Sequence, residues 1–324
     1  VWYAGIRMAE WLLLVWIVFR FQLSIREIMV SLGVGVILST VLAVQQFLAQ
    51  NSQGGLWYFL GERDFSVTTP GIAHLLSFGR ILLRPYATFS HPNEFGGYLL
   101  MVTTLFIFSP SIHNKIGVNT KSQLDFVFRQ TVIVAGSLGV WLSFSRTAWG
   151  IYLLVLAAYF YFRTKKPTII VALLVIGIFI VVEEAGIGRL RALFTTDQIS
   201  TNERVALIQS ALRMWYAFPI FGVGPLHFIG KLPMFSPPPY LLQPVHSIYL
   251  LMLAETGLVG LGIFLAVIYR ALRYAWNRRP GVRMAVLVAL GLGTTDHYLL
   301  TLTQTQLLFA LVLALAFLPR SRYN

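Results

Sequence analysis

The feature that most constrains this chain is a series of long, uninterrupted apolar segments. Residues 246–268 form the clearest one, and residues 127–144 and 148–162 are apolar on every face. A helix needs about 17–25 residues to cross the hydrocarbon core of a bilayer, and a segment that is apolar all round must be buried in lipid or in a bundle. Because the runs are continuous rather than alternating, we predict an all-α polytopic membrane protein and not a β-barrel.

Composition agrees with this class. Only 11% of the residues are charged and 57% are hydrophobic, whereas soluble domains carry about a quarter charged residues. The net charge of +13 is spread over short loops, which argues against nucleic-acid binding. Cysteine is absent, so disulfides and thiolate metal sites are excluded. Val1 already lies in an apolar run, so we expect residues 1–324 to be a single transmembrane domain that is truncated at its N-terminus.

Nine spans are predicted, with one long loop between the sixth and the seventh. The spans are 2–20, 28–49, 94–109, 127–144, 147–162, 167–183, 246–268, 284–298 and 304–318. The last two meet near Asp296-His297 and are expected to form a helical hairpin. The long loop, 184–245, contains a predicted amphipathic helix at about 201–217.

The distribution of Lys and Arg predicts the orientation of the spans. Basic residues concentrate in the connections around 163–166 and 270–283, so that side is predicted to be cytoplasmic. The opposite side carries the loops 50–93 and 184–245. Loops of this length are usually functional, so we expect function on the extracytoplasmic face.

Arg204 is the first candidate residue in the long loop. A capping box at Ser200–Glu203 predicts a helix start. At 100° per residue, Arg204 shares a stripe with Ile208 and Trp215, so it is predicted to face the apolar side, whereas Arg213 faces water. A buried guanidinium needs an anionic or carbonyl partner. A structural ion pair and an anion-binding role both remain open.

Two further candidates lie at span ends on the same predicted face. Arg146 sits between two apolar spans and either is solvated by headgroups or faces a polar cavity. His246 begins the seventh span and is either an interfacial residue or an acid or base near neutral pH. Glu255 lies on the opposite side of that helix from His246, so we expect it to make a structural hydrogen bond to a neighbouring helix.

The stretch 87–100 offers supporting groups just before the third span. Asn93 or Ser90 is predicted to cap that helix, beside His91, and Gly96-Gly97 allows close helix approach. Arg84 lies shortly upstream. Arginines near headgroup depth suit a diphosphate, and a histidine beside them can take a proton from an attacking hydroxyl. The histidines are scattered without ligand spacing, so no metal site is predicted.

Five stretches, taken in order, resemble the signature stretches of the O-antigen ligase family, which also includes polysaccharide polymerases and some protein-glycosylating enzymes. They are TFSHPNEFGGYL, SFSRTAWGIYL, NERVALIQSALRMWYAFPIFGVGPLHF, VHSIYLLMLAETGLVGLGIF and TDHYLLTLTQTQLLFALVLAL. The resemblance covers about residues 80–318.

The resemblance implies a membrane glycosyltransferase with a GT-C-like helical bundle in the bacterial inner membrane and an active site that faces the periplasm. It implies an undecaprenyl- or other polyprenyl-diphosphate-linked glycan as donor and a lipid or glycan hydroxyl as acceptor, as in lipopolysaccharide and cell-envelope polysaccharide biosynthesis. Transfer is implied to be inverting and to need no cofactor or metal.

The resemblance also assigns roles to particular residues. His246 and Gly257 match the family's H-x10-G motif, and Arg204 matches its R-x3-L motif, with Ile208 in place of Leu. Arg146 matches the arginine at the preceding helix turn. Arg146 and Arg204 are then expected to hold the donor diphosphate and His246 to be catalytic. The candidate supporting residues are Arg84, His91 and Asn93.

Three alternatives remain at this stage. A polymerase of the same family would use the same donor and a lipid-linked glycan as acceptor. A lipid or polysaccharide transporter would show broken helices with charge near mid-membrane, for which Glu255, Arg7 and Glu10 are the candidates. A non-catalytic scaffold is the third.

Overall fold

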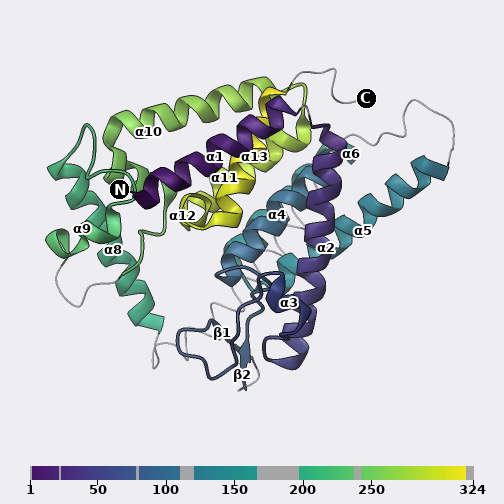
Figure 1. Cartoon of the computed structure of the whole chain (residues 1–324), viewed down its shortest axis with the longest axis horizontal. Coiled ribbons are helices and arrows are strands. Elements are labelled where there is room, and N and C mark those ends of the chain that lie inside the picture. Colours follow the sequence, from purple (N-terminus) through teal and green to yellow (C-terminus); the bar gives the residue numbers. More distant parts are fainter. Residues whose placement is uncertain are drawn as a thin grey trace.

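The computed structural model describes residues 2–21, 23–77, 80–109, 120–165, 197–236 and 242–318. Within them the fold is almost entirely helical (Figure 1). The elements are α1 (Trp2–Arg20), α2 (Ile25–Ala49), α3 (Leu56–Phe59), β1 (His74–Ser77), β2 (Arg80–Leu83), α4 (Pro92–Phe108), α5 (Thr120–Leu142), α6 (Arg146–Thr164), α8 (Asp197–Ala217), α9 (Phe228–Phe235), α10 (Ile248–Ala275), α11 (Pro280–Gly293), α12 (Tyr298–Thr301) and α13 (Thr303–Phe317).

The predicted spans coincide with helices wherever the structure describes them. Eight of the nine correspond to α1, α2, α4, α5, α6, α10, α11 and α13, and the remaining one, 167–183, lies outside the described residues. Ile25–Ala49, Gln123–Leu142 and Ile248–Ala275 are long and apolar enough to cross a membrane, and α11 and α13 are shorter apolar helices. The structure therefore supports a helical membrane protein, while nine spans and the GT-C-like arrangement remain predictions.

Helix α4 lies at the centre of the main core, and most of its side chains are buried. It packs against α5, α6 and α11, while α2 packs against α5 and α11 against α13. Two glycines permit close approach to α4, as predicted: a methyl group at Gly96 would lie 2.8 Å from the Ser143 Cβ, and one at Gly97 would lie 2.7 Å from the Tyr298 ring. The α11–α13 packing confirms the predicted hairpin and brings its turn to the N-terminal end of α4.

The first long loop folds into a compact cap at one end of the molecule (Figure 1). It contains the one-turn helix α3 and an antiparallel pair in which His74 of β1 lies opposite Leu83 of β2. The buried Gln46 of α2 ties the loop down, because its side chain bonds to Glu62 and to the backbone of Tyr86 and Ala87. The loop is therefore anchored to the end of a spanning helix.

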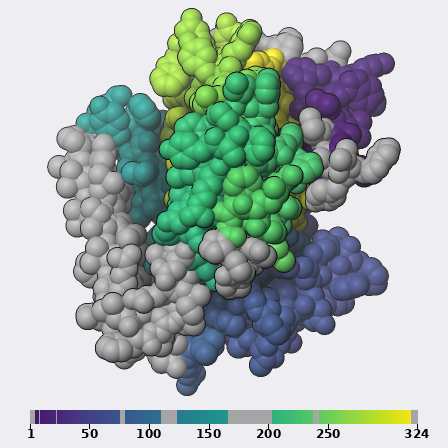
Figure 2. Space-filling model, turned by 90° about the vertical axis from the view of Figure 1, so that its left-hand side faces the viewer, coloured from purple at the N-terminus to yellow at the C-terminus, as the bar shows by residue number. Residues whose placement is uncertain are grey.

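The second long loop supplies α8 and α9, which pack on α10 around a separate apolar cluster (Figure 2). Helix α8 begins at Asp197, four residues before the start at 201 predicted from the Ser200–Glu203 capping box, so Ser200 lies within the helix rather than at its cap. The predicted proline-rich turn at 237–239 lies outside the described residues.

Helix α10 is broken at Gly257, which adopts φ 63° and ψ −163°. Residues 219–224 close the gap with four backbone hydrogen bonds: Val223 N–H to Ala254 O, Gly224 N–H to Glu255 O, Leu258 N–H to Pro219 O and Val259 N–H to Ile220 O. Backbone groups freed in a spanning helix must find partners within the protein. The break is therefore a built junction between α10 and the loop that precedes α9.

Candidate functional site

Three helix ends converge on one polar cluster. His91 precedes α4 and caps it, because its Nδ1 accepts the Asn93 N–H at 3.1 Å. His246 precedes α10, whose cap is Ser247. Asp296 and His297 lie in the turn between α11 and α12. The predicted caps Asn93 and Ser90 were therefore wrong, and His246 is left free of a capping role.

His246 faces the carboxylate of Asp296. Its Nδ1 lies 3.6 Å from Asp296 Oδ1, and the two side chains are 21% and 13% exposed. This separation is longer than a hydrogen bond but close enough for an ion pair if the imidazole is protonated. Since Nδ1 faces the carboxylate, Nε2 is the nitrogen that remains for a substrate.

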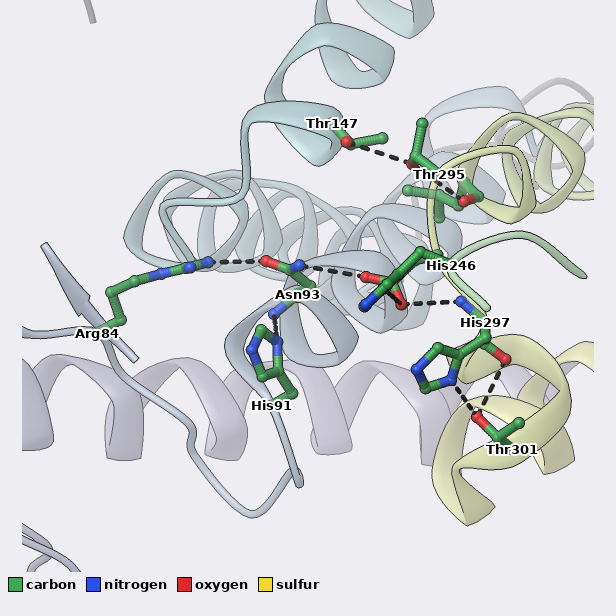
Figure 3. A network of polar contacts seen from close by, with 10 residues as sticks. Arg84, His91, Asn93, Thr147, His246, Thr295, His297 and Thr301 are labelled. Carbon is green, nitrogen blue, oxygen red and sulfur yellow. Dashed lines mark hydrogen bonds and ion pairs between the residues drawn. The ribbon is translucent and has the colours of Figure 1, made fainter. Parts of the chain in front are cut away.

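Asn93 contacts Asp296, and Arg84 points toward Asn93 from the opposite side (Figure 3). Asn93 Nδ2 donates to Asp296 Oδ2 at 3.2 Å, and Asn93 Oδ1 accepts from Arg84 Nη2 at 2.8 Å. Arg84 also donates to the Ser143 carbonyl, which follows α5. A continuous chain of polar contacts thus runs from Arg84 through Asn93 to Asp296 and leaves Oδ1 directed at His246.

His297 lies beside His246, with ring centroids 5.2 Å apart. Its Nδ1 is 2.6 Å from Thr301 Oγ1, and that hydroxyl donates to the His297 carbonyl at 3.1 Å. Because the Thr301 hydroxyl proton is donated to this carbonyl, the hydroxyl oxygen must accept a proton from Nδ1. We therefore assign the Nδ1–H tautomer to neutral His297. Burial, together with the charge of His246, lowers the pKa of His297 to about 4 against the opposing effect of Asp296.

Asp296 stays ionised at neutral pH. Burial alone would raise its pKa, but the interaction with His246, the charge of His297 and the His297 backbone N–H outweigh burial and lower the pKa to about 2. An ionised carboxylate beside His246 favours the imidazolium that forms when His246 takes up a proton. The cluster therefore has the polarity that a general base requires.

Arg146 begins the helix whose second residue contacts the turn of this cluster. It is the first residue of α6, after the cap Ser145, and it is exposed. The adjacent Thr147 accepts a hydrogen bond from Thr295 at 3.3 Å, which joins the start of α6 to the turn that holds Asp296 (Figure 3). The structure thus brings Arg146 to the same end of the bundle as His246.

The structure contradicts the predicted burial of Arg204. The buried stripe of α8 consists of Leu207, Ser210, Ala211 and Met214, which pack toward α9 and α10. Arg204 is exposed, whereas Ser210, six residues further along the helix, is buried. The stripe was misplaced because side-chain apolarity alone does not show which face the partner helices cover. Arg213 is exposed, as predicted.

Glu255 fulfils the structural role expected of it. Its carboxylate accepts the backbone N–H of Leu226 at 2.9 Å and of Phe228 at 3.0 Å, at the start of α9. These bonds lie beside the junction at Gly257. Glu255 therefore fixes α9 to α10 and makes no contact with His246 within the described residues.

A group with metal-ligand spacing emerges only in three dimensions. One ligand atom from each of His246, Asp296 and His297 lies within 4.8 Å of the others. This group could not be recognised from the sequence, because fifty residues separate His246 from Asp296. The expected absence of a metal therefore remains a prediction for chelation to test.

Asp296 was not predicted to be a site residue. The only sequence feature that pointed to it was its position in the hairpin turn on the predicted functional face. Its partners Asn93 and His246 are remote in sequence, so their pairing appears only when α4, α10 and α11 pack together.

Comparisons with known proteins bear on the family. A search of curated proteins gave no match. Residues 131–265, less than half of the chain, match the family model described as O-antigen ligase. The matched region contains Arg146, Arg204, His246 and Gly257, and the family comprises ligases and polymerases of the glycosyltransferase type. The match agrees with the resemblance shown by the sequence motifs, and residues 131–265 of this chain are similar to the O-antigen ligase family.

Proposed function

We propose that this protein transfers a glycan from a polyprenyl-diphosphate carrier to an acceptor hydroxyl on the extracytoplasmic face of the membrane. The observation that carries the proposal is the pairing of His246 with the ionised Asp296, in a turn that contacts the start of α6, where Arg146 is exposed. The paired imidazole supplies the base, and the Arg146 guanidinium, which forms no ion pair within the described residues, supplies a site for the diphosphate.

His246 Nε2 takes the proton of the acceptor hydroxyl as its oxygen bonds to the anomeric carbon of the donor sugar. The bond between that carbon and the diphosphate oxygen breaks, and the electron pair leaves with the diphosphate. Attack from the face opposite the leaving group inverts the anomeric centre. The imidazolium forms next to Asp296, whose negative charge stabilises it.

The donor diphosphate is assigned to Arg146 and Arg204. Neither forms an ion pair within the described residues, and both are exposed. Arg146 also lies at the N-terminus of α6, where the helix dipole favours an anion. Arg204 reaches the same diphosphate only if α8 presents it there, so its role rests on the family motif.

A polymerase that uses the same donor is the second candidate, since the base and the diphosphate site serve either acceptor. A transporter is less well supported. The break in α10 and Glu255 match part of that expectation, but both carboxylate oxygens of Glu255 and four backbone groups at the break already have protein partners. The Glu255 carboxylate is therefore engaged in holding α9 to α10.

The test compares His246→Ala with His74→Ala, an exposed histidine of β1. Purified full-length chain is incubated with polyprenyl-diphosphate oligosaccharide and candidate acceptors, and products are identified by mass. We expect loss of transfer with normal expression in the first variant and wild-type transfer in the second. Retained transfer by His246→Ala would remove the proposed base, and glycan translocation without a new glycosidic bond would favour the transporter.

A further inference from the structure

We propose that a hollow in the first long loop is a subsite for a sugar residue of the glycan. The hollow measures about 380 Å³ and lies over α3 and the residues on either side of it. The inference rests on the proposed function, since it assigns part of the glycan substrate to a second place on the same protein.

The loop folds so that aromatic and charged side chains share one wall. Gly54 and Gly55 adopt φ 65° and 57°, which turns the chain sharply into α3. Tyr58 and Phe59 follow on α3 and are 63% and 84% exposed. The buried Glu62 accepts from the Gln53 and Gly54 N–H groups and from Gln46, which fixes the turn to α2.

The polar groups of the hollow have free bonding capacity. Asp64 accepts from Ser52 Oγ through Oδ1 at 2.9 Å, and its Oδ2 has no partner within the described residues. Arg63 donates through Nη2 only, which leaves Nη1 and Nε without partners in that same part of the chain. A carboxylate and a guanidinium bind vicinal hydroxyls, while exposed rings pack on the C–H face of a sugar. Ligand sites combine apolar surface with a few placed polar groups in this way.

The hollow is connected to the candidate active site. Arg63 Nη2 donates to the Ser90 carbonyl at 2.7 Å, immediately before His91. The same guanidinium lies 5.2 Å from the Tyr86 ring, and that ring lies 6.2 Å from the His91 ring. One wall of the hollow is thus continuous with the residue that caps α4 beside Asn93. A glycan that reacts at His246 can extend toward the hollow.

Insertion of the aromatics into lipid is the competing explanation, because Tyr is common at membrane interfaces. The charged lining favours a sugar over lipid. Two neighbouring leucines offer matched controls: Leu56 begins α3 and Leu60 directly follows it, and they are 73% and 53% exposed but do not line the hollow. Insertion into lipid would depend on these leucines as much as on Phe59. Sugar binding in the hollow would depend on Phe59 and not on the leucines.

The experiment measures initial rates for Phe59→Ala, Tyr58→Ala, Leu56→Ala and Leu60→Ala. The donors are polyprenyl-diphosphate oligosaccharide from native membranes and polyprenyl-diphosphate N-acetylglucosamine, each at varied acceptor concentration. Loss of one ring contact is expected to raise KM by up to about tenfold, with kcat unchanged and with no effect in the leucine variants. A higher KM for the oligosaccharide donor alone assigns the hollow to donor glycan, and a higher acceptor KM assigns it to acceptor glycan.

Two results would overturn the subsite: unchanged KM values in both aromatic variants, or equal changes in the leucine variants. These leave the proposed function standing if the wild type still transfers glycan. If the wild type transfers nothing, the proposed function fails separately. Saturation-transfer NMR with the free oligosaccharide then decides the subsite: a signal that Phe59→Ala abolishes supports it, and no wild-type signal refutes it.

Discussion

Replacement of Gly257 by alanine tests the broken helix most directly. Gly257 occupies φ 63° and ψ −163°, a region that is accessible almost only to glycine. A methyl group there would lie 2.6 Å from the Phe221 nitrogen and closer still to the Ile220 carbonyl. Both neighbours are backbone atoms, so no side chain can rotate away to make room.

The expected destabilisation follows from these two effects. A strained backbone conformation of this kind costs about 1–3 kcal/mol. Relief of the clash requires residues 219–224 to move off α10, which weakens the bonds made by Leu258 and Val259, each worth about 0.5–1.5 kcal/mol net. We therefore expect a loss of about 3–5 kcal/mol, which is large for one methyl group.

Gly262 in the same helix provides the control. It has helical geometry, and a methyl group there meets nothing within 4 Å. Alanine is favoured over glycine in a helix by about 0.5–1 kcal/mol, so Gly262→Ala is expected to leave stability equal or slightly higher. The two variants add the same atoms to the same helix.

The assay measures thermal unfolding of both purified variants, together with glycan transfer at a temperature where both remain folded. We expect a clear fall in melting temperature and transfer for Gly257→Ala only. Gly222→Ala, which strains the other side of the junction at φ 68°, is expected to be non-additive with it. Equal stability and activity of Gly257→Ala and Gly262→Ala would refute the view that the break is a required junction.

Four further predictions concern the cluster and its substrate. Asp296→Asn should lower kcat at least about 100-fold with little change in donor KM, because the imidazolium loses its counter-charge, and unchanged kcat would remove Asp296 from the mechanism. The melting temperature should fall as pH drops from about 6.5 to about 4, because the unfolded chain binds protons at His91 and His297, whose pKa values are each lowered to about 4 in the folded protein; His297→Asn should make this fall smaller, and an unaltered profile would contradict the assignment to His297. Arg204→Lys should raise donor KM, since an ammonium does not reproduce a guanidinium fork, whereas wild-type kinetics would argue for a structural role. Transfer should survive EDTA, and a loss that added Zn²⁺ or Mn²⁺ restores would make His246, Asp296 and His297 a metal site.

The helices were predictable because membrane burial imposes a simple rule on sequence. A span must be apolar over its whole length, so the runs around α2, α5 and α10 show their positions without knowledge of their neighbours. The loops follow no such rule. The stretch that forms β1 and β2 gave only an amphipathic pattern, and its hairpin depends on a tie between Leu83 and Gln50 that is remote in sequence.

In the candidate site, a residue could be predicted when its own type was unusual beside a span. A residue was missed when only its contact with another residue made it part of the site. His246 and Arg146 stand out because charge and imidazole are rare beside spans. Asp296 belongs to the same site only through contacts with His246 and Asn93, and these depend on how α4, α10 and α11 pack. Arg204 was misplaced for a related reason, since α9 and α10 decide which face of α8 is buried.

The spacing of the H-x10-G motif has a physical explanation in this fold. His246 lies just before α10 and Gly257 breaks it, so the two residues are separated by the first part of α10, about two and a half helical turns long. At one end His246 faces Asp296, and at the other the break receives residues 219–224, while Glu255 holds the start of α9. Helix α9 packs on α8, which carries Arg204. The fixed length of helix between His246 and the break at Gly257 therefore sets the position of the His246 imidazole relative to α8, although His246 and Arg204 lie on different elements. The residue types alone do not explain the spacing. It follows because His246 must face Asp296 while the break at Gly257 must receive residues 219–224.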